Sequence, residues 1–181
     1  MKYHNITKAD MLNGEGLRVV LWVSGCNHAC PGCHNQITWN ANNGLLFDES
    51  AKEEIFNELK EDWCAGLTLS GGDPLFPLNR EVIKDLVLEV REKFPNKTIW
   101  CYTGYTWEEL QKEKKKDPNI EIILENIDVL LDGRFILKEA DEKIHYVGSR
   151  NQRVIDIPKT LENKKIVLYI DNTKKEVKYN A

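Results

Sequence analysis

Residues 18–33 read RVVLWVSGCNHACPGC, and this stretch decides both the class of fold and the place of the chemistry. Its first part, from Arg18 to Ser24, is a continuous apolar run of strand length, which is typical of a buried strand. A loop begins directly after it, at Gly25, and carries three cysteines in the spacing C-x3-C-x2-C. The stretch therefore predicts a buried strand that ends in a loop with several metal-binding side chains.

Downstream of this stretch, segments with helical periodicity alternate with short apolar strands. The clearest helix is expected over residues 79–94, between Pro77 and Pro95. Two other helices are expected over residues 48–63 and 106–116, and three other strands over residues 67–70, 98–102 and 127–131. This alternation indicates an α/β fold made of βαβ units around a parallel sheet. Because a full eightfold barrel needs about 250 residues, a chain of 181 residues is long enough only for an open arc.

The C-terminal end follows a different pattern. Residues 164–170 and 174–179 are two β-rich runs on either side of a polar turn, which predicts a β-hairpin. We therefore divide the chain into a main domain, residues 1–160, and a C-terminal extension, residues 161–181, that shields the edge of the sheet. The lysine-rich residues 112–116 predict a solvated helix face.

Composition and charge narrow the function classes. Lys and Arg together number 25 against 29 Asp and Glu, so the net charge is −4, which argues against a nucleic-acid binder. The sequence has no apolar run of about 18 residues that would span a membrane, and its first ten residues lack the apolar core of a signal peptide. We expect a cytoplasmic protein whose cysteines stay reduced.

The cysteines point to a metal site of one of two kinds. Thiolates at the spacing of the cysteine loop can converge on one soft metal centre. Structural zinc takes four protein ligands, so a zinc site would need His28, His34 or a more distant residue as the fourth. An iron–sulfur cube has four irons, and three cysteines would leave one iron open to a substrate. The two other cysteines, Cys64 and Cys101, are expected to be small packed side chains of the core.

Three unusual segments each follow a predicted parallel strand: the cysteine loop, Gly71-Gly72-Asp73-Pro74 and Thr103-Gly104-Tyr105. Ligands of parallel sheets bind beyond the carboxyl ends of the strands, so we expect these segments at one rim. Gly71 and Gly72 would let the backbone approach a ligand closely, and exposed amides of this turn can bind an anionic or carbonyl group. The carboxylate of Asp73 can accept hydrogen bonds from an ammonium group.

These motifs resemble the radical S-adenosylmethionine enzymes through the C-x3-C-x2-C loop and the Gly-Gly-Asp-Pro turn. Within that superfamily, the chain is similar to the proteins that activate the anaerobic ribonucleoside-triphosphate reductase. The matching segments run in order from about residue 3 to residue 156 and comprise residues 25–35, 69–75, 102–105, 131–135 and 148–156. The resemblance implies a short, partial and open (βα)6-type radical S-adenosylmethionine barrel with the hairpin as an extension. Many members of the superfamily have an aromatic residue where this chain has Gly32, but the activating proteins tolerate this arrangement.

The resemblance also implies the cofactors and their ligands. A [4Fe–4S] cluster would be held by Cys26, Cys30 and Cys33, and its fourth iron would bind the amino and carboxylate groups of S-adenosylmethionine. The residues expected to receive the methionine ammonium are Gly71, Gly72 and Asp73, and those expected to contact the adenosyl part are Gly32, Cys33 and His34.

The implied reaction is reductive cleavage of S-adenosylmethionine to a 5′-deoxyadenosyl radical. This radical would take hydrogen from a glycine of the large reductase subunit and leave a glycyl radical there. The implied electron donor is a small flavoprotein such as reduced flavodoxin.

Two other functions stay open from the sequence: a radical enzyme for a small molecule, similar to a deazapurine synthase, and a zinc-stabilised binding module. We expect His28 and His34 to be polar loop residues that are hydrogen-bonded near the cluster. Four arginines are candidates for contact with the reductase or with the cofactor carboxylate: Arg18, Arg134, Arg150 and Arg153.

Overall fold

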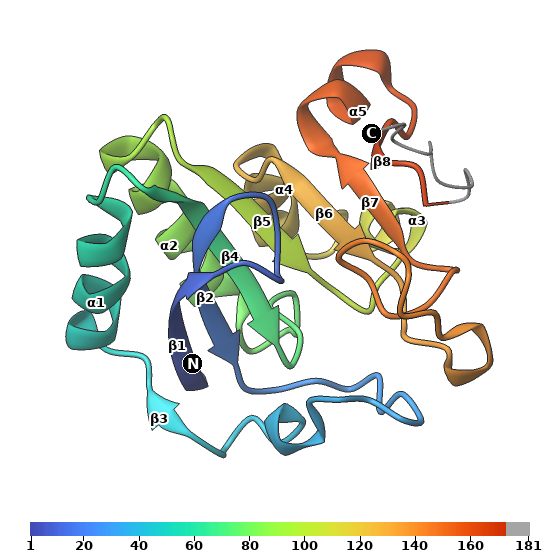
Figure 1. Ribbon diagram of the computed structural model, residues 1–181, viewed down its shortest axis with the longest axis horizontal. Helices are drawn as coiled ribbons and strands as arrows, with labels where there is room; N and C mark the ends of the chain where they lie inside the picture. The colour runs from blue at the N-terminus through green and yellow to red at the C-terminus, as the bar shows by residue number, and fades with distance from the viewer. Residues whose placement is uncertain (173–181) are drawn as a thin grey trace, which may run out of the picture.

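The computed structural model describes residues 1–172 of the chain, and Figure 1 shows the arrangement of their helices and strands. Within this range the strands form one eight-stranded sheet in the order β3-β1-β2-β4-β5-β6-β7-β8. The strands are β1 (Lys2–Asp10), β2 (Leu17–Val23), β3 (Leu45–Leu46), β4 (Cys64–Gly71), β5 (Thr98–Tyr102), β6 (Val129–Asp132), β7 (Arg153–Asp156) and β8 (Leu168–Ile170). The α-helices are α1 (Glu49–Leu59), α2 (Arg80–Lys93), α3 (Trp107–Glu113), α4 (Pro118–Glu125) and α5 (Ile157–Asn163), and two 3₁₀ turns are η1 (Gln36–Thr38) and η2 (Leu137–Glu139).

The middle of the sheet is parallel and both of its flanks are antiparallel. Strands β2, β4, β5 and β6 run parallel to one another. Strand β1 pairs antiparallel with β2, and β7 and β8 continue antiparallel from β6. The structure therefore confirms the mixed α/β class and an open sheet, while the six-unit radical S-adenosylmethionine barrel is not confirmed.

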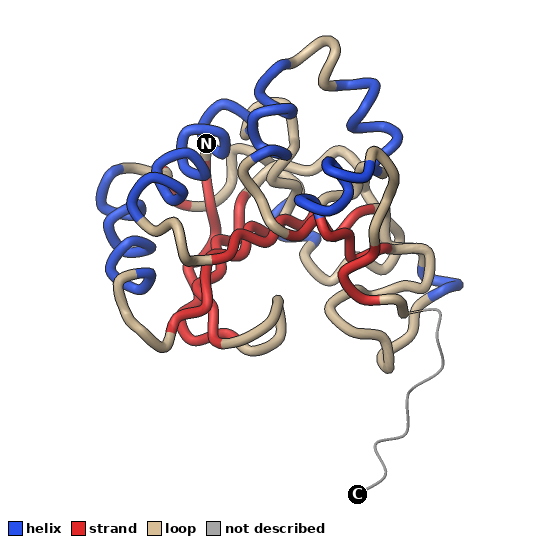
Figure 2. Tube along the Cα trace, turned by 90° about the horizontal axis from the view of Figure 1, so that it is seen from above, coloured by secondary structure: helices blue, strands red, loops and turns tan. Residues whose placement is uncertain are grey.

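The two faces of the sheet bury different clusters. Figure 2 shows most of the helices gathered on one side of the sheet. The apolar faces of α1 and α2 pack there against strand residues such as Val19, Leu67 and Ile99, which are fully buried. A smaller cluster around Trp100, Leu131 and Val154 lies on the opposite face. Because the sheet is buried on both faces at its centre, its strands are continuously apolar, as in the stretch from Arg18 onward.

The local sequence explains the helix boundaries, including one that differs from our expectation. Helix α2 lies within the expected segment, with Asn79 at its N-cap and Phe94 at its C-cap. The first helix was expected to reach residue 63 but ends at Leu59. Trp63 is consequently exposed and does not join the core, and Cys64 begins strand β4. The lysine-rich residues 112–116 were expected to form a helix face, but α3 ends at Glu113 and a turn follows, so residues 114–116 are not helical.

Arg18 has a structural role on the second face. Its side chain is fully buried and its guanidinium stacks over the ring of Trp100, 5.2 Å from the ring centroid. All its nitrogens donate hydrogen bonds, at 2.7 Å to the Thr68 hydroxyl and at 2.8–3.1 Å to Thr98 and to backbone carbonyls. Burial lowers the pKa of Arg18 to about 10. Arg18 therefore links β2, β4 and β5 and is not available to a partner or a cofactor.

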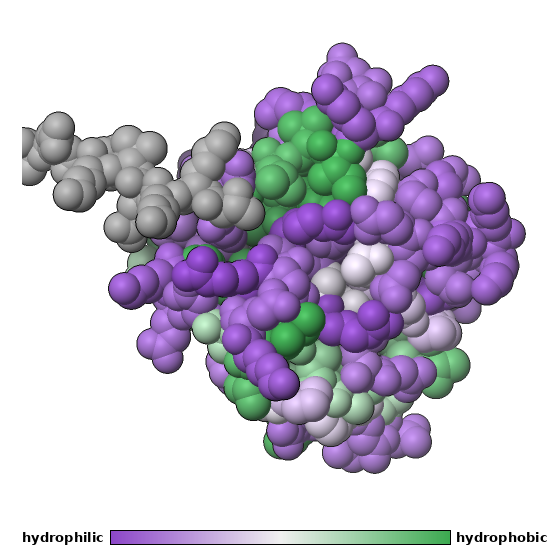
Figure 3. Space-filling view, turned by 90° about the vertical axis from the view of Figure 1, so that its right-hand side faces the viewer, coloured by the Kyte–Doolittle hydropathy of each residue, from purple (hydrophilic) through white to green (hydrophobic). Residues whose placement is uncertain are grey.

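The C-terminal extension is described in part. Strand β8 pairs with β7, and the second run of the predicted hairpin, residues 174–179, lies outside the described residues. Helix α5 crosses residue 160, and the division into residues 1–160 and 161–181 stays a prediction. Figure 3 faces this edge and shows a hydrophobic patch where α5 and β8 lie; Leu161 and Leu168 are partly exposed. Among residues 1–172, none of the helices is long and apolar enough to cross a membrane.

Candidate metal centre

The loops that follow the parallel strands meet at one rim of the sheet, as the sequence predicted. The amide of Gly72 donates to the carbonyl oxygen of Val23 at 2.8 Å, and the amide of Asp73 donates to that of Gly25 at 2.8 Å. These bonds attach the turn after β4 to the start of the cysteine loop after β2. The His28 ring crosses from the cysteine loop to the turn after β4, since its Nε2 lies 2.7 Å from Oδ2 of Asp73.

The cysteine loop brings its three thiols into one region. Cys26, Cys30 and Cys33 are all half-buried and none is part of a disulfide. Positive φ angles at Ala29 and Gly32 bend the loop, and the Cys33 amide donates to the Cys30 carbonyl at 3.0 Å. Burial raises the pKa of the Cys26 thiol to about 11, and negative charge on Asp73, Cys30 and Cys33 adds to the shift. Burial also raises the pKa of the Cys30 thiol, with a contribution from negative charge on Cys33.

Asp73 is the most heavily bonded residue of the rim. Its side chain is 1% exposed. The Leu75 amide donates to Oδ1 at 2.8 Å, the Thr103 hydroxyl lies 3.0 and 3.1 Å from the two oxygens, and the Gly104 amide donates to Oδ2 at 3.1 Å. With His28 as the fourth partner, the carboxylate joins the loops after β2, β4 and β5. The protein's own donors therefore occupy the acceptor positions that a carboxylate offers.

The glycines before Asp73 are needed for close packing. A Cβ at Gly71 would lie 2.7 Å from backbone atoms of Val23, and φ is +100° there. A Cβ at Gly72 would lie 2.6 Å from the carbonyl oxygen of Gly25. The amides of this turn were expected to be open to a ligand, but those of Gly72 and Asp73 are paired with the backbone after β2. Among residues 1–172, the carbonyl oxygens of Gly72 and Pro74 accept no backbone hydrogen bond from the turns and loops of the rim.

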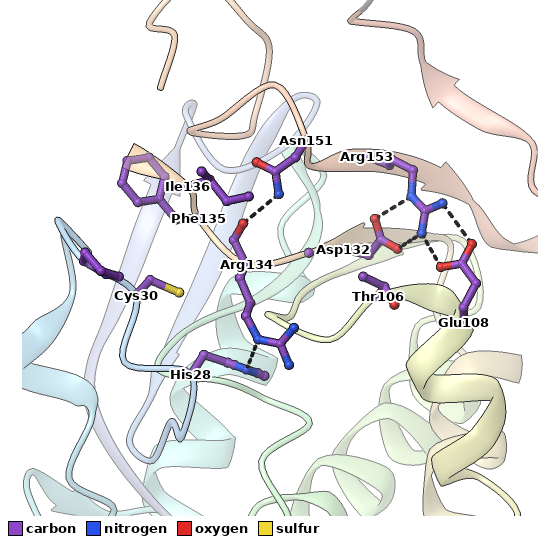
Figure 4. A pocket seen from close by; sticks show the side chains of 12 residues that line it. His28, Cys30, Thr106, Glu108, Asp132, Arg134, Phe135, Ile136, Asn151 and Arg153 are labelled. Carbon is purple, nitrogen blue, oxygen red and sulfur yellow. Dashed lines mark hydrogen bonds and ion pairs between the residues drawn. The ribbon is translucent and has the colours of Figure 1, made fainter. Parts of the chain in front are cut away.

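A cavity of about 510 Å³ opens beside the cysteine loop. Figure 4 shows Cys30 at one end of it, Arg153 with Asp132 and Glu108 at the other, and the side chain of Arg134 between them, reaching to His28. Arg153 is held by Glu108 at 2.8 Å and by Asp132, to which it makes a very short contact. The remaining lining residues are Pro31, Thr106, Gly133, Phe135, Ile136 and Asn151.

The arginine candidates differ in what they can reach. Arg134 lies in this cavity and its guanidinium is half exposed, with Nε donating to Nδ1 of His28 at 3.1 Å and the terminal nitrogens 3.2 Å from Glu109. Arg150 instead forms a 2.5 Å ion pair with Asp141, and it does not line this cavity. Arg134 is therefore the candidate arginine with the most open access to a ligand beside the cysteine loop.

His34 and Gly32 face a second cavity, of about 400 Å³, on the other side of Phe135. The His34 ring lies 5.9 Å from that of Phe135. A Cβ at Gly32 would lie 3.1 Å from Leu137, so glycine lets the loop after β6 pack against the cysteine loop.

The segment 148–152 fastens the loop that carries Arg134 and Phe135. The side-chain amide of Gln152 accepts from the Gly148 and Ser149 amides at 3.0 and 3.1 Å and donates to the Gly133 carbonyl at 2.9 Å. Asn151 donates to the Arg134 carbonyl at 2.8 Å, as Figure 4 also shows. In the sequence, this segment stood out only because it resembles the corresponding segment of the activating proteins, and its role in fastening the loop was not predicted. The feature that could have predicted this role is the pair of amide side chains, Asn151 and Gln152, because an amide side chain can both donate to and accept from backbone groups.

Two donor sets could hold a metal at this rim. One ligand atom each from Cys26, His28 and Asp73 lie within 4.8 Å of one another. However, His28 and Asp73 already bond to each other and to further groups. The three thiols of the cysteine loop are the soft ligands that an iron–sulfur cluster requires, so the donor set fits a [4Fe–4S] cluster.

Comparisons with known proteins identify relatives along most of the chain. A family model described as "4Fe-4S single cluster domain" matches residues 12–155. A protein of Haemophilus influenzae is 46% identical over 154 residues, which cover 84% of this chain and 96% of the relative. A relative from Enterobacteria phage T4 is 43% identical over 154 residues, which cover 85% of this chain and 93% of the relative. A relative from Escherichia coli K12 is 40% identical over 156 residues, which cover 85% of this chain and 97% of the relative. All three carry the name anaerobic ribonucleoside-triphosphate reductase-activating protein.

Proposed function

The chain belongs to the family of anaerobic ribonucleoside-triphosphate reductase-activating proteins, and we propose that it activates such a reductase by generating a glycyl radical in it. The proposed cofactors are one [4Fe–4S] cluster and S-adenosylmethionine. The proposed reaction makes the chain a radical-generating enzyme whose substrate is another protein.

One observation carries this proposal: the chain offers three accessible thiols at the rim and no fourth. Cys64 and Cys101 are 1% and 0% exposed and belong to the core on the helix side of the sheet. Cys26, Cys30 and Cys33 are half-buried on one loop. Three thiolates for four irons leave one iron to a ligand from solution, which a closed structural site would not do.

When bound, the reduced cluster supplies one electron to S-adenosylmethionine, whose sulfur–carbon bond breaks to give methionine and a 5′-deoxyadenosyl radical. The turn of Gly71, Gly72 and Asp73 would receive the methionine ammonium. The carbonyl oxygens of Gly72 and Pro74, which accept no backbone hydrogen bond from the turns and loops of the rim, are candidate acceptors for it, and Asp73 holds the turn in place through its bonds to neighbouring loops. Gly32, Cys33 and His34 would contact the adenosyl part from the side of the cysteine loop.

The 5′-deoxyadenosyl radical would take a hydrogen atom from a glycine of the large reductase subunit and become 5′-deoxyadenosine. The product in the reductase is the glycyl radical. We propose a small flavoprotein such as reduced flavodoxin as the electron donor.

The test uses the full chain prepared without oxygen and reconstituted with iron and sulfide. With a strong reductant and S-adenosylmethionine it should form 5′-deoxyadenosine, and the added reductase subunit should show a glycyl radical signal by electron paramagnetic resonance. A Cys101→Ala chain serves as the matched control and should behave like the parent. An intact cluster that forms no 5′-deoxyadenosine would refute the proposal.

Two alternatives each have an observation in their favour. The cavity of about 510 Å³ beside Cys30 is large enough for a small-molecule substrate, as in a deazapurine synthase-like enzyme. Formation of 5′-deoxyadenosine without any radical on the reductase would favour this alternative. The group Cys26, His28 and Asp73 would suit a zinc-stabilised binding module. One zinc and no iron in protein purified without oxygen would favour that one.

A further inference from the structure

His28 touches the loops that follow all the other parallel strands. It sits in the loop after β2, and its partners are Asp73 after β4, Gly104 and Tyr105 after β5, and Arg134 after β6. Its side chain is only 7% exposed although the loop itself lies at the surface. Two residues before it and two after it are the thiols Cys26 and Cys30.

The hydrogen bonds of His28 define one orientation of the ring. An arginine side chain can donate but not accept, so the contact from Arg134 Nε at 3.1 Å requires a lone pair on Nδ1 of His28. The proton of the neutral ring therefore lies on Nε2, where it is donated to Asp73 at 2.7 Å. A flipped ring would lose both bonds.

The neighbouring residues Gly104 and Tyr105 pack closely around the His28 ring. A Cβ at Gly104 would lie 2.2 Å from Cδ2 of His28, so only glycine leaves room there. The Tyr105 ring meets the imidazole edge to face, with centroids 4.7 Å apart. Packing and hydrogen bonding thus fix the same position of the side chain.

From these contacts we infer that His28 is a positioning residue that sets the geometry of the cysteine loop and of Arg134. This inference rests on the proposed function in one respect, because the thiols that His28 positions are those proposed to hold the cluster. The bond to Asp73 holds the segment between Cys26 and Cys30 against the other loops. The bond from Arg134 leaves its terminal nitrogens with Glu109 at the cavity, where a carboxylate ligand can reach them.

The experiment compares His28→Phe with His28→Gln. Phenylalanine keeps a ring in the slot beside Gly104 but removes both hydrogen bonds. Glutamine offers one N–H donor and one carbonyl acceptor and can replace both. His145→Phe is the matched control, because His145 is exposed and lies outside both cavities of the rim. Gly104→Ala moves the ring without changing its chemistry, and it keeps the test open should His28→Phe fail to fold.

Four readouts are needed. The first is the rate of alkylation of each cysteine in the metal-free chain, followed by mass spectrometry. The second is the iron content, and the third is the electron paramagnetic resonance spectrum of the reduced protein with and without S-adenosylmethionine. The fourth is KM and kcat for 5′-deoxyadenosine formation. His28→Phe and Gly104→Ala should alkylate faster at Cys26 while Cys101 stays protected. They should also change the spectrum and raise KM by about 10–100-fold, the usual effect of removing an outer-shell partner, whereas His28→Gln stays within a few-fold of the parent.

The inference is overturned if His28→Phe matches the parent in alkylation, spectrum and KM. It is also overturned if the parent holds zinc and every His28 variant loses it, because His28 would then be a ligand. Alkylation does not depend on the cluster, so it tests the positioning even if the parent assembles no cluster. In that case the proposed function fails on its own while the positioning is still decided.

Discussion

Replacing Asp73 by Asn tests whether this carboxylate holds the rim together. The two side chains have nearly the same shape, but Asn substitutes an N–H donor for one of the acceptor oxygens. An amide oxygen in the place of Oδ1 can still accept from Leu75 and Thr103. The new amide nitrogen, in the place of Oδ2, would face two donors, the Gly104 amide and Nε2 of His28.

The cost follows from these two conflicts. Leaving one buried donor unsatisfied costs about 1–3 kcal/mol, so two such donors facing the new amide should lower the free energy of unfolding by about 2–6 kcal/mol. For a chain of this size, each kcal/mol corresponds to about 2–4 °C in the melting temperature. We therefore expect Asp73→Asn to melt roughly 4–24 °C below the parent.

The assay is thermal unfolding followed by circular dichroism, on protein prepared and measured without oxygen. Asp85→Asn is the control, because Asp85 is largely exposed and pairs with its neighbour Lys84. Its melting temperature should shift by little, as surface changes usually alter stability by less than about 0.5 kcal/mol. In a His28→Gln chain, the same Asp73→Asn change should lower the free energy of unfolding by less than it does in the parent, because the carbonyl oxygen of the Gln side chain can accept a hydrogen bond from the new amide.

A melting temperature of Asp73→Asn within about 2 °C of the parent would refute this account of the rim, since it corresponds to less than about 1 kcal/mol. Equal costs in the parent and His28→Gln chains would show that Asp73 and His28 do not interact.

Three further predictions test other parts of the structure. Cys30→Ala should abolish iron binding and 5′-deoxyadenosine formation. Cys101→Ala should keep both, and its free energy of unfolding in urea should fall by about 1–2 kcal/mol, as is usual for a small core change. Equal losses of iron and activity in the two variants would mean that the wrong thiols were assigned to the cluster. Arg153 lowers the pKa of Glu108 to about 2, so its stabilisation is complete above pH 4.5 and is lost as the pH falls toward 2. Glu108→Gln should flatten the fall in unfolding free energy over that window, by less than about 1 kcal/mol because the pair is exposed, and unchanged acid titration curves would contradict this. Gln152→Ala should speed hydrogen exchange of the amides in residues 133–136, and unchanged exchange there would show that this side chain does not fasten the loop.

Much of the fold was predictable because local patterns coincide with tertiary burial. The strand expected at residues 98–102 is β5 within its expected bounds, and α2 lies within residues 79–94. The convergence of three loops at one rim was also predictable, since it follows from the direction of parallel strands. Burial of Cys64 and Cys101 confirms that they are core side chains.

Elements whose burial depends on the rest of the fold could not be predicted in the same way. Strand β1 has polar residues at most of its positions and is a strand because β2 pairs with it. Strand β7 is antiparallel to β6, which its four residues do not reveal. Trp63 is the last residue of the helix expected over residues 48–63, but the helix ends at Leu59 and leaves Trp63 exposed.

The place of the candidate site was predictable, because its loops meet at one rim, but the hydrogen bonds of its residues were not. The motif named Asp73 as an acceptor for a ligand, whereas its oxygens accept from Leu75, Thr103, Gly104 and His28. Three of these partners are 30 or more residues away in sequence. Side-chain bonds over such separations leave no local pattern.

The central claim is that three thiolates leave one of four irons open to S-adenosylmethionine. Mössbauer spectroscopy of the ⁵⁷Fe-reconstituted protein, recorded with and without S-adenosylmethionine, tests it most directly. We predict that one iron in four changes its isomer shift when S-adenosylmethionine binds, while the other three keep theirs. Four irons with the same parameters in both samples would contradict the claim, because a side chain of the protein would then complete the site.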